Sequence, residues 1–453
     1  MTTASQITVQ FLEQIVKCVP VGTNLALLQL MWAMITGSFL TSRGAIHSAL
    51  ANSGFEPGEI RRSWRALRWG QWNVYELIRS FRQQVKQTGQ WQVREYGGYR
   101  PLAVDTTAYW RPRLQGWPGK LYRQLTGKTM TGIGFGLIAD VGQVGEQRLP
   151  LIRAIVRGHN AAEKETTLKE RTVAKAARLL NENEVLLHDG GLSIAQLQAA
   201  GAARFVVRLG TNCTARRPYL PDYKGRGRRP TKGILVRPLS RKWKERTLPA
   251  TRPDVTMSFN IDERPVIARG WHELMRSDLK VADKHELFSI WVFDDPLFKT
   301  PLVLGTNLSA VPEVVFRLYL DRWPVEQVPL VAKQMLGCQR QFVFAHTSCW
   351  RLGELSFLAG NILTWLAVLL PPQPSGYWDR HPKKHQDDCA GSWRRLFFQM
   401  IVFLTDNFEK SVRLQTIYQK ELMLIDEQDA YNGLIRLIWT HIVKVRFQSL
   451  SFG

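Results

Sequence analysis

The chain has 453 residues, 45% of them hydrophobic, and its 61 Lys and Arg against 38 Asp and Glu give a formal net charge of +23. This composition excludes a disordered chain and predicts two to four globular domains of roughly 100–200 residues each. Because so large a charge opposes compaction by self-repulsion, it indicates a polyanionic partner, with nucleic acid favoured over an anionic membrane surface.

Cysteine usage and the apolar segments indicate a cytoplasmic protein. Five cysteines without a CxxC pair argue against a disulfide framework and favour a reducing compartment. The first residues show no basic region followed by an apolar core, so we expect no signal peptide. Residues 18–42 and 355–378 carry no charge, but polar side chains interrupt the first and two prolines the second. Both are therefore predicted to be buried helices, with no membrane span.

Residues 1–95 are predicted to form a helical DNA-binding domain. The hydrophobic pattern is helical, and glycines and a proline at 54–58 separate two helical blocks. Three arginines of the second block share one helical face: Arg61, Arg65 and Arg68. We expect this face to contact DNA phosphates, although a solvated face with tryptophans packed behind it gives the same pattern.

A mixed α/β domain is expected to begin at residue 96. Apolar strands and one amphipathic helix follow in the order strand-strand-strand-helix-strand: 101–105, 128–141, 147–157, 161–183 (the helix) and 184–189. The first and last of these strands end at Asp105 and Asp189. A mixed sheet brings those ends together, and carboxylates that converge in a basic protein require a cation to offset their repulsion.

A third acid lies in the segment YLDRWPVEQVPLVAK, which has the spacing Y-x2-R-x3-E-x6-K. The residues of this signature are Tyr319, Arg322, Glu326 and Lys333. On an ideal helix they form one polar stripe, and a salt-bridged helix surface is the alternative interpretation. Pro324 is expected to begin a new helix and Pro329 to kink it, so the stripe is approximate at Lys333.

These motifs resemble the DDE-class bacterial insertion-sequence transposases, specifically the cut-and-paste group related to insertion sequence four. The resemblance covers about residues 98–370 and rests on Asp105 in LAVDTT, Asp189 in LLHDGG and the Tyr-Arg-Glu-Lys signature. It implies an RNase H-like catalytic core formed by residues 96–211 and 301–370.

The same resemblance implies the roles of the site residues. Asp105, Asp189 and Glu326 would be catalytic and would hold two Mg²⁺ ions, for which Mn²⁺ may substitute as a hard, oxygen-preferring ion. Two such ions activate the nucleophile and neutralise the leaving oxygen in phosphodiester cleavage. Tyr319, Arg322 and Lys333 would bind DNA phosphates near the cut.

A basic, β-rich insertion is expected at residues 212–300, because Asp189 and Glu326 lie 137 positions apart. Residues 204–252 contain 15 Lys and Arg but only two acids. The segment YKGRGRRPTKG carries Arg226, Arg228 and Arg229 and resembles arms that enter the DNA minor groove; a solvated loop is the alternative.

A tryptophan in or beside the insertion could stack on a DNA base. Related transposases stack an aromatic side chain on a flipped base, and Trp243, Trp271 and Trp291 lie in or beside the insertion. Spacing does not identify one of them, although Trp291 is expected in the core. Farther along the chain, Cys338, His346 and Cys349 match no zinc motif. Residues 371–392 are predicted to be a linker, and 393–453 a helical dimerisation or packing domain.

The residues themselves predict a basic, DNA-handling protein with a metal-carboxylate centre. The resemblance implies a transposase of the bacterial cytoplasm and nucleoid, which would bind the terminal inverted repeats of its element as a homodimer in a synaptic complex, cleave the ends and join the 3′-hydroxyls to target DNA. The sequence does not indicate whether excision passes through a DNA hairpin intermediate. The alternatives are an RNase H-like nuclease or resolvase that cuts without joining, and a transposase-derived repressor that binds DNA without catalysis.

Overall fold

The computed structural model describes residues 3–369 except 118, 124–125, 159–164, 226, 285 and 340. The predicted linker 371–392, the predicted domain 393–453 and Arg226 lie outside the described residues. Contacts divide the chain into two compact units. Unit 1 contains the described residues of 1–88, 144–147 and 330–453, and unit 2 contains those of 89–143 and 148–329.

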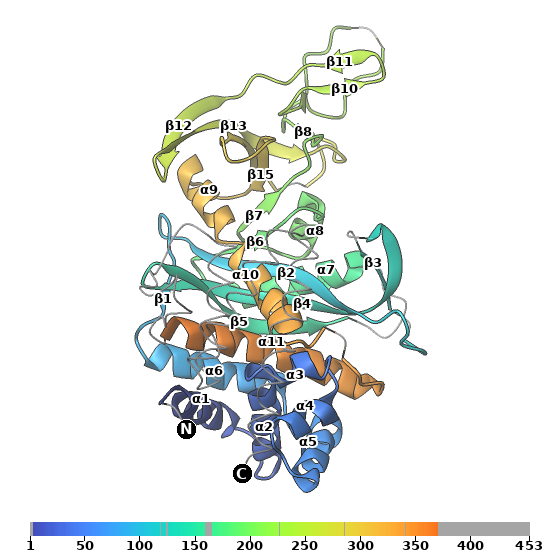
Figure 1. The fold of residues 1–453 in the computed structure, drawn as a ribbon. Coiled ribbons are helices and arrows are strands. Elements are labelled where there is room, and N and C mark those ends of the chain that lie inside the picture. Colours follow the sequence, from blue (N-terminus) through green and yellow to red (C-terminus); the bar gives the residue numbers. More distant parts are fainter. Residues whose placement is uncertain are drawn as a thin grey trace, which may run out of the picture. The chain divides into compact units, whose positions relative to one another are not determined.

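Apart from residues 144–147, which connect β4 to β5, the regular secondary structure of unit 1 is helical over its described residues (Figure 1). Its elements are α1 (Thr3–Val16), α2 (Thr23–Ile35), α3 (Ser38–Thr41), α4 (Ile46–Asn52), α5 (Pro57–Trp69), α6 (Val74–Gln87), the π-helix η2 (Val331–Met335) and α11 (His346–Leu369). Apolar positions at helical spacing face the interior of the unit, where Phe81 of α6 and Phe357 of α11 are fully buried. Burial of these apolar faces is the main source of stability for such short helices.

Helix α11 is the one described helix that is long and apolar enough to cross a membrane by length and composition. Of its most apolar window, 83% is buried inside the protein. The prediction of a buried helix is therefore confirmed for residues 355–369.

Unit 2 contains a mixed sheet with helices. Its strands are β1 (Gln92–Val93), β2 (Arg100–Trp110), β3 (Lys120–Arg123), β4 (Lys128–Val144), β5 (Gln147–Arg157), β6 (Glu184–His188), β7 (Phe205–Arg208), β8 (Ala215–Arg216), β9 (Leu235–Val236), β10 (Arg241–Trp243), β11 (Arg246–Leu248), β12 (Val255–Ile261), β13 (Arg264–Arg276), β14 (Phe288–Asp294) and β15 (Leu302–Thr306). Its helices are α7 (Glu165–Leu179), α8 (Ile194–Ala199), α9 (Pro312–Leu320) and α10 (Pro324–Leu330).

The main path of the sheet is β1-β4-β2-β6-β7-β15-β14-β13-β8-β9, with β3 and β5 paired to β4 and β12 paired to β13. Strands β2, β6 and β7 are parallel to one another, whereas β4 on one side and β15 on the other are antiparallel to their neighbours. The prediction of a mixed α/β fold is confirmed at this level.

Strand β6 shows why the sheet has helices on both faces. All five of its residues are buried, as expected for a central parallel strand. Leu186 packs with Val173 of α7 in one hydrophobic cluster, and Leu187 packs with Phe316 of α9 in another. Because side chains alternate along a strand, these neighbours point to opposite faces.

The structure corrects one predicted boundary. Strand β2 does not end at Asp105 but continues to Trp110, because residues beyond the aspartate keep pairing with β4 as far as the Trp110–Gly132 pair. The β-branched and aromatic side chains of TTAYW favour this extension. The predicted insertion also shares the main sheet, since β14 pairs antiparallel with β15.

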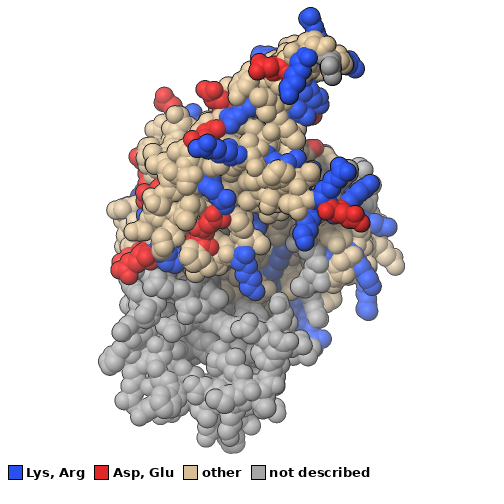
Figure 2. Space-filling model, turned by 90° about the horizontal axis from the view of Figure 1, so that it is seen from above, with Lys and Arg blue, Asp and Glu red and all other residues tan. Residues whose placement is uncertain are grey.

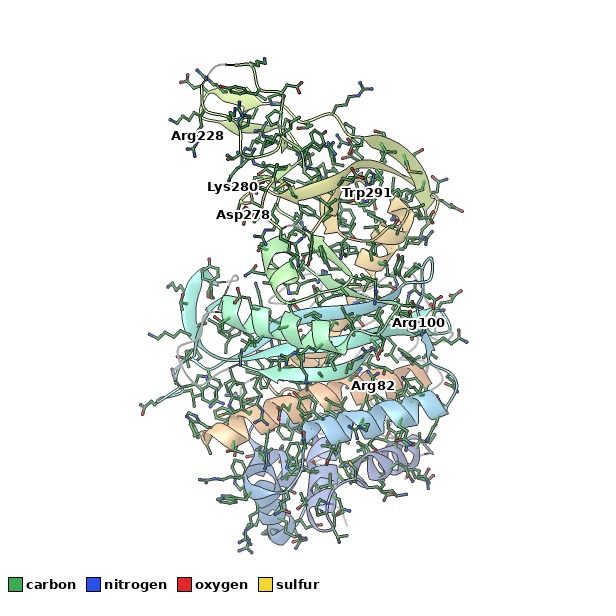
Figure 3. The ribbon with its side chains drawn as sticks, turned by 180° about the vertical axis from the view of Figure 1, so that it is seen from behind. Arg82, Arg100, Arg228, Asp278, Lys280 and Trp291 are labelled. Atoms are coloured by element: carbon green, nitrogen blue, oxygen red, sulfur yellow. The ribbon has the colours of Figure 1, made fainter. Side chains whose placement is uncertain are left out.

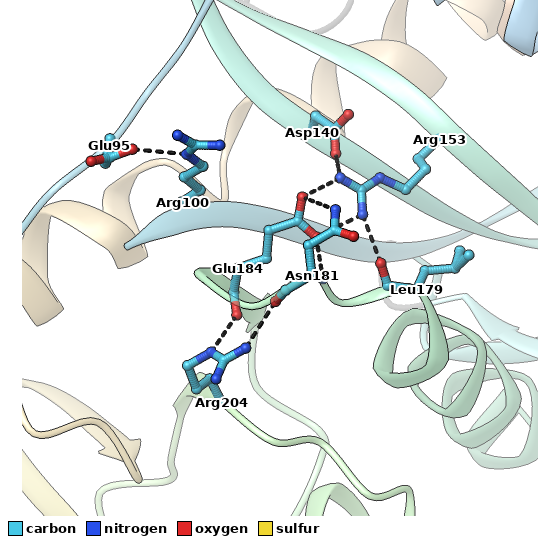
Figure 4. A network of polar contacts seen from close by, with 8 residues as sticks. All are labelled: Glu95, Arg100, Asp140, Arg153, Leu179, Asn181, Glu184 and Arg204. Atoms are coloured by element: carbon cyan, nitrogen blue, oxygen red, sulfur yellow. Dashed lines mark hydrogen bonds and ion pairs between the residues drawn. The ribbon is translucent and has the colours of Figure 1, made fainter. Parts of the chain in front are cut away.

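A buried ion network joins three strands at the amino-terminal end of β6 (Figure 4). Arg153 of β5 donates to the Glu184 carboxylate at 2.7 Å and pairs with Asp140 of β4. The side chain and backbone N–H of Asn181 donate to the same carboxylate, each at 2.9 Å. Burial alone would raise the pKa of Glu184, but the hydrogen bonds from Arg153 and Asn181 lower it to about 2.

We predict that this network makes stability depend on acid. The depressed pKa stabilises the fold above the ordinary value of 4.5, and this contribution is lost as pH falls through about 2. Wild type should therefore exceed Glu184→Gln by roughly 2–3 kcal/mol in unfolding free energy at pH 7. Urea unfolding should show the difference shrinking between pH 5 and pH 2, and a constant difference would contradict the assignment.

Candidate active site

The register of the parallel strands places the two predicted aspartates side by side. Val104 of β2 pairs with His188 of β6, so the following residues, Asp105 and Asp189, are neighbours at the carboxyl end of the pair. Strand β2 continues past Asp105, whereas the chain leaves the sheet after His188 and turns at Gly191, whose φ is +95°. Both aspartates are half-buried.

The carboxylate of Asp189 is held by side chains from distant parts of the sequence. The Tyr319 hydroxyl on α9 donates to Asp189 Oδ1 at 3.0 Å. The Arg322 guanidinium lies 3.9 Å from Oδ2, and that of Arg208 lies 3.7 Å from Oδ1. Burial raises the pKa of Asp189, but the Arg322 charge and the Gly190 N–H outweigh it, so the net pKa is lowered.

Tyr319 is the neutral member of this cluster. Its hydroxyl is buried against Asp189, and burial followed by the negative charge of that aspartate raises the pKa of Tyr319 to about 12. The phenol therefore stays protonated and acts as a hydrogen-bond donor to the carboxylate.

Arg322 joins the second aspartate to the glutamate of the signature. Its Nη1 donates to Oε1 of Glu326, in the first turn of α10. Only 8% of Arg322 is exposed. Burial lowers the pKa of the guanidinium, but Asp189 and Glu326 more than compensate, and the net pKa is raised. Arg322 is thus a permanent, largely buried cation between two carboxylates.

The signature does not lie on one helix, which corrects the prediction of a single polar stripe. Helix α9 ends at Leu320, and α10 begins at Pro324, which has no backbone N–H to continue a helical ladder. Pro329 lies inside α10, and the chain passes at once into the π-helix η2, which carries Lys333. Lys333 belongs to unit 1, whereas Tyr319, Arg322 and Glu326 belong to unit 2.

A buried aspartate that the sequence analysis missed fixes the bend between α9 and α10. The side chain of Asp321 is fully buried. Arg94 donates to its Oδ2 at 2.7 Å and Tyr96 donates to the same oxygen at 2.9 Å, while Arg148 lies 3.3 Å from Oδ1. These partners lie far away in the sequence, so no local motif predicts the contacts. The only indication in the sequence is a charged residue, Asp321, directly after the apolar segment LYL.

The other predicted DNA-contacting arginines belong to other elements. Arg61, Arg65 and Arg68 are exposed on α5 of unit 1. Arg228 and Arg229 are exposed in unit 2, where Figure 3 shows Arg228 near the β10–β11 hairpin, and Arg229 lies over the Tyr223 ring at 5.6 Å.

The tryptophans and cysteines of interest are mostly buried. Trp271 and Trp291 are 1% and 3% exposed, so neither is presented for stacking on a base in this structure, and the side chain of Trp243 is outside the described residues. Cys338 is buried, and the Cys349 thiol donates to the Val343 carbonyl at 3.3 Å.

The residue types at the site suit Mg²⁺ better than their present arrangement does. Carboxylate oxygens are the ligands that this ion prefers, and Asp105 and Asp189 are adjacent by register. Glu326, however, is engaged with Arg322. Within the described part of the chain, no three His, Cys, Asp or Glu residues are close enough to hold a metal ion. The three predicted carboxylates therefore do not form a metal-binding group among the described residues.

In comparisons with known proteins, no protein-family model matches the sequence, and no curated protein is significantly similar to it.

We predict that Asp321→Asn lowers the free energy of unfolding by about 3–4 kcal/mol, because loss of one partner of a buried ion pair leaves uncompensated charge on Arg94. Asp278→Asn is the control, since Asp278 is 64% exposed and pairs with Arg276 at the surface. It should cost less than about 1 kcal/mol. Equal shifts of the urea unfolding transition in the two variants would refute the anchoring role of Asp321.

Proposed function

We propose that the chain is a DDE-class DNA transposase with an RNase H-like core in residues 96–211 and 301–370. The observation that carries the proposal is the cluster of Asp189, Tyr319, Arg322 and Glu326. Tyr319 and Arg322 bring together two carboxylates that lie 137 positions apart in the sequence. A surface salt bridge between neighbours on one helix would not recruit Asp189 across the fold.

The topology around the aspartates also supports the proposed core. The strands run in the order β5-β4-β2-β6-β7, with β4 antiparallel to β2, and with β6 and β7 parallel to it. Helix α7 separates β5 from β6 in the sequence. Polar groups at the carboxyl ends of adjacent parallel strands commonly build active sites in such sheets.

In this proposal Asp105, Asp189 and Glu326 hold two Mg²⁺ ions, with Mn²⁺ as a substitute. When bound, the ions supply an activated water or 3′-hydroxyl and neutralise charge on the leaving oxygen. The protein's own groups prepare the site: Tyr319 orients the Asp189 carboxylate, and Arg322 and Lys333 bind DNA phosphates.

Arg322 explains how DNA completes the site. A guanidinium binds a phosphate through two parallel hydrogen bonds, at least as well as it binds a carboxylate. When the Arg322 guanidinium binds a DNA phosphate in place of Glu326, the glutamate loses its ion-pair partner. The glutamate is then free to join Asp105 and Asp189 as the third ligand.

The charge distribution supports duplex DNA as substrate, in the form of terminal inverted repeats and target DNA. On the face shown in Figure 2, Lys and Arg side chains project from the described surface in several places, including the top and the right of the view, whereas most of the Asp and Glu side chains lie on the left. We propose a homodimer in a synaptic complex, in the bacterial cytoplasm at the nucleoid. A nuclease or resolvase would cut without joining, and a repressor would bind without cutting.

We predict that wild type cuts and joins DNA that carries the element's ends in Mg²⁺. Asp189→Asn and Glu326→Ala should still bind these ends but should lose about a thousandfold or more in cleavage, because several kcal/mol of charge stabilisation is removed. Glu313→Ala should cleave like wild type, since Glu313 is an exposed partner of Arg317 on α9.

The outcomes separate the alternatives. Cleavage without joining would identify a nuclease or resolvase. Binding by all proteins with no cleavage by any would favour the repressor. Cleavage that survives in both carboxylate variants would remove the proposed catalytic centre.

A further inference from the structure

Strand β12 lies at an edge of the sheet in unit 2. Each of its residues, Val255–Ile261, pairs antiparallel with β13, and β13 pairs with β14 on its other side. Strands β12 and β13 form a hairpin (Figure 1). Among the described residues no second strand pairs with β12. One row of its backbone N–H and C=O groups is therefore directed away from the sheet.

This edge lacks the features by which proteins usually protect such strands. Edge strands are commonly blocked by charged side chains, by proline or by a β-bulge. The sequence of β12, VTMSFNI, contains no charged residue, no proline and no glycine, and it pairs with β13 without a shift of register. Strand β12 is therefore suited to pairing with a further strand.

The acidic residues that flank β12 lie outside its pairing segment. Asp254, just before the strand, accepts a hydrogen bond from Arg217 at 3.0 Å and another from the His272 N–H at 2.8 Å. Asp262 and Glu263 form the two-residue turn into β13, with φ values of +47° and +67°. Two left-handed residues are typical of a tight hairpin turn. The charge is therefore confined to the two ends of the edge.

The polarity of β12 is symmetric about its central residue, Ser258. Apolar and polar side chains alternate strictly along the strand. Antiparallel pairing with a second copy, about a two-fold axis at Ser258, therefore matches apolar with apolar and polar with polar side chains. The resulting cross-strand pairs are Val255–Ile261, Thr256–Asn260, Met257–Phe259 and Ser258 with itself. A register shifted by one residue would place each apolar side chain opposite a polar one.

The apolar side of β12 is only partly covered within one copy. Ile261 is buried in the hydrophobic cluster that contains Phe316, and Val255 and Phe259 pack against this cluster. Met257 lies on the same side by alternation and is 43% exposed. In the symmetric pair it meets Phe259 of the second copy, and a thioether packs favourably against an aromatic ring. Pairing would thus cover the exposed methionine.

A second copy fits this edge better than nucleic acid or an acidic protein. Phosphates and carboxylates are recognised by cations, and β12 carries none. Two copies repel each other through a net charge of +23 each, but an uncharged strand adds no like-charge contact to that repulsion. A two-fold pair also uses the same surface on both copies and is closed, so it does not propagate into a fibre.

We propose that β12 pairs with β12 of a second copy of this chain, antiparallel and in register about Ser258. The two sheets then join into one continuous sheet. This contact is separate from the dimerisation or packing role expected for residues 393–453. It requires neither DNA nor metal, so it goes beyond the proposed function and does not rest on it.

Sedimentation velocity of the full-length protein without DNA tests the pairing. Wild type should dimerise as its concentration rises, and added salt should strengthen dimerisation because it screens the net charge. Ser258→Lys and Ser258→Glu should each weaken dimerisation by about tenfold or more, because identical charges then face each other at the two-fold axis. An equimolar mixture of the two variants should dimerise again, because lysine then lies opposite glutamate.

Thr129→Lys is the matched control, since Thr129 is an exposed strand residue of β4 that pairs with β3. It should dimerise like wild type. Ser258 is also exposed, so thermal unfolding of its variants should match that of Thr129→Lys. Hydrogen exchange of wild type gives a readout that needs no variant: the amides of β12 should exchange more slowly as the protein passes from monomer to dimer.

Three results would overturn the inference. Wild type could stay monomeric at its highest soluble concentration, dimerisation could be insensitive to both Ser258 variants, or the mixture of the two variants could stay monomeric. The proposed function is tested separately, because the pairing is measured without DNA. Dimerisation through β12 without any DNA cleavage would support the pairing and contradict the transposase proposal, and cleavage by a protein whose β12 does not pair would do the reverse.

Discussion

The candidate site depends on one largely buried cation, Arg322, which lies between two carboxylates. Asp189 follows a strand and Glu326 lies in the first turn of a helix, and like charges gathered around one site repel unless a cation offsets them. Arg322 pairs with both and needs no external ion to do so. In the proposed transposase the same pairing occupies the glutamate, which would have to leave Arg322 before it could share a metal ion with the aspartates.

The neighbouring residue supplies the rigidity that this arrangement requires. Asp321 is fully buried and is contacted by Arg94, Tyr96 and Arg148. Consecutive residues therefore have separate tasks: Asp321 anchors the bend, and Arg322 faces the site. Pro324 begins the next helix shortly afterwards and thereby fixes the position of Glu326 in the first turn of α10.

Local pattern in the sequence located much of the sheet, and the expected convergence of the strand ends at Asp105 and Asp189 is confirmed by the pairing of β2 with β6. Strands β4 and β5 fall where apolar patterning predicts them, and Pro324 begins a helix, because these features depend on adjacent residues. The predicted end of a strand at Asp105 was wrong, since pairing with β4 continues beyond it. The Asp321 network could not be predicted, because its partners become neighbours only when the sheet forms. The cluster around Asp189 could be predicted only from the spacing of the Tyr-Arg-Glu-Lys signature and from its resemblance to a family.

The most direct test of the central claim is an electron paramagnetic resonance titration of Mn²⁺ against the full-length protein with a duplex carrying the element's ends. We predict weak binding by protein alone and two tightly bound ions once the duplex is present. Tight binding should be lost in Asp189→Asn and Glu326→Ala, while Arg322→Ala should bind Mn²⁺ more tightly than wild type without DNA. The same number of tightly bound ions in wild type and both carboxylate variants would show that Asp189 and Glu326 do not hold the metal.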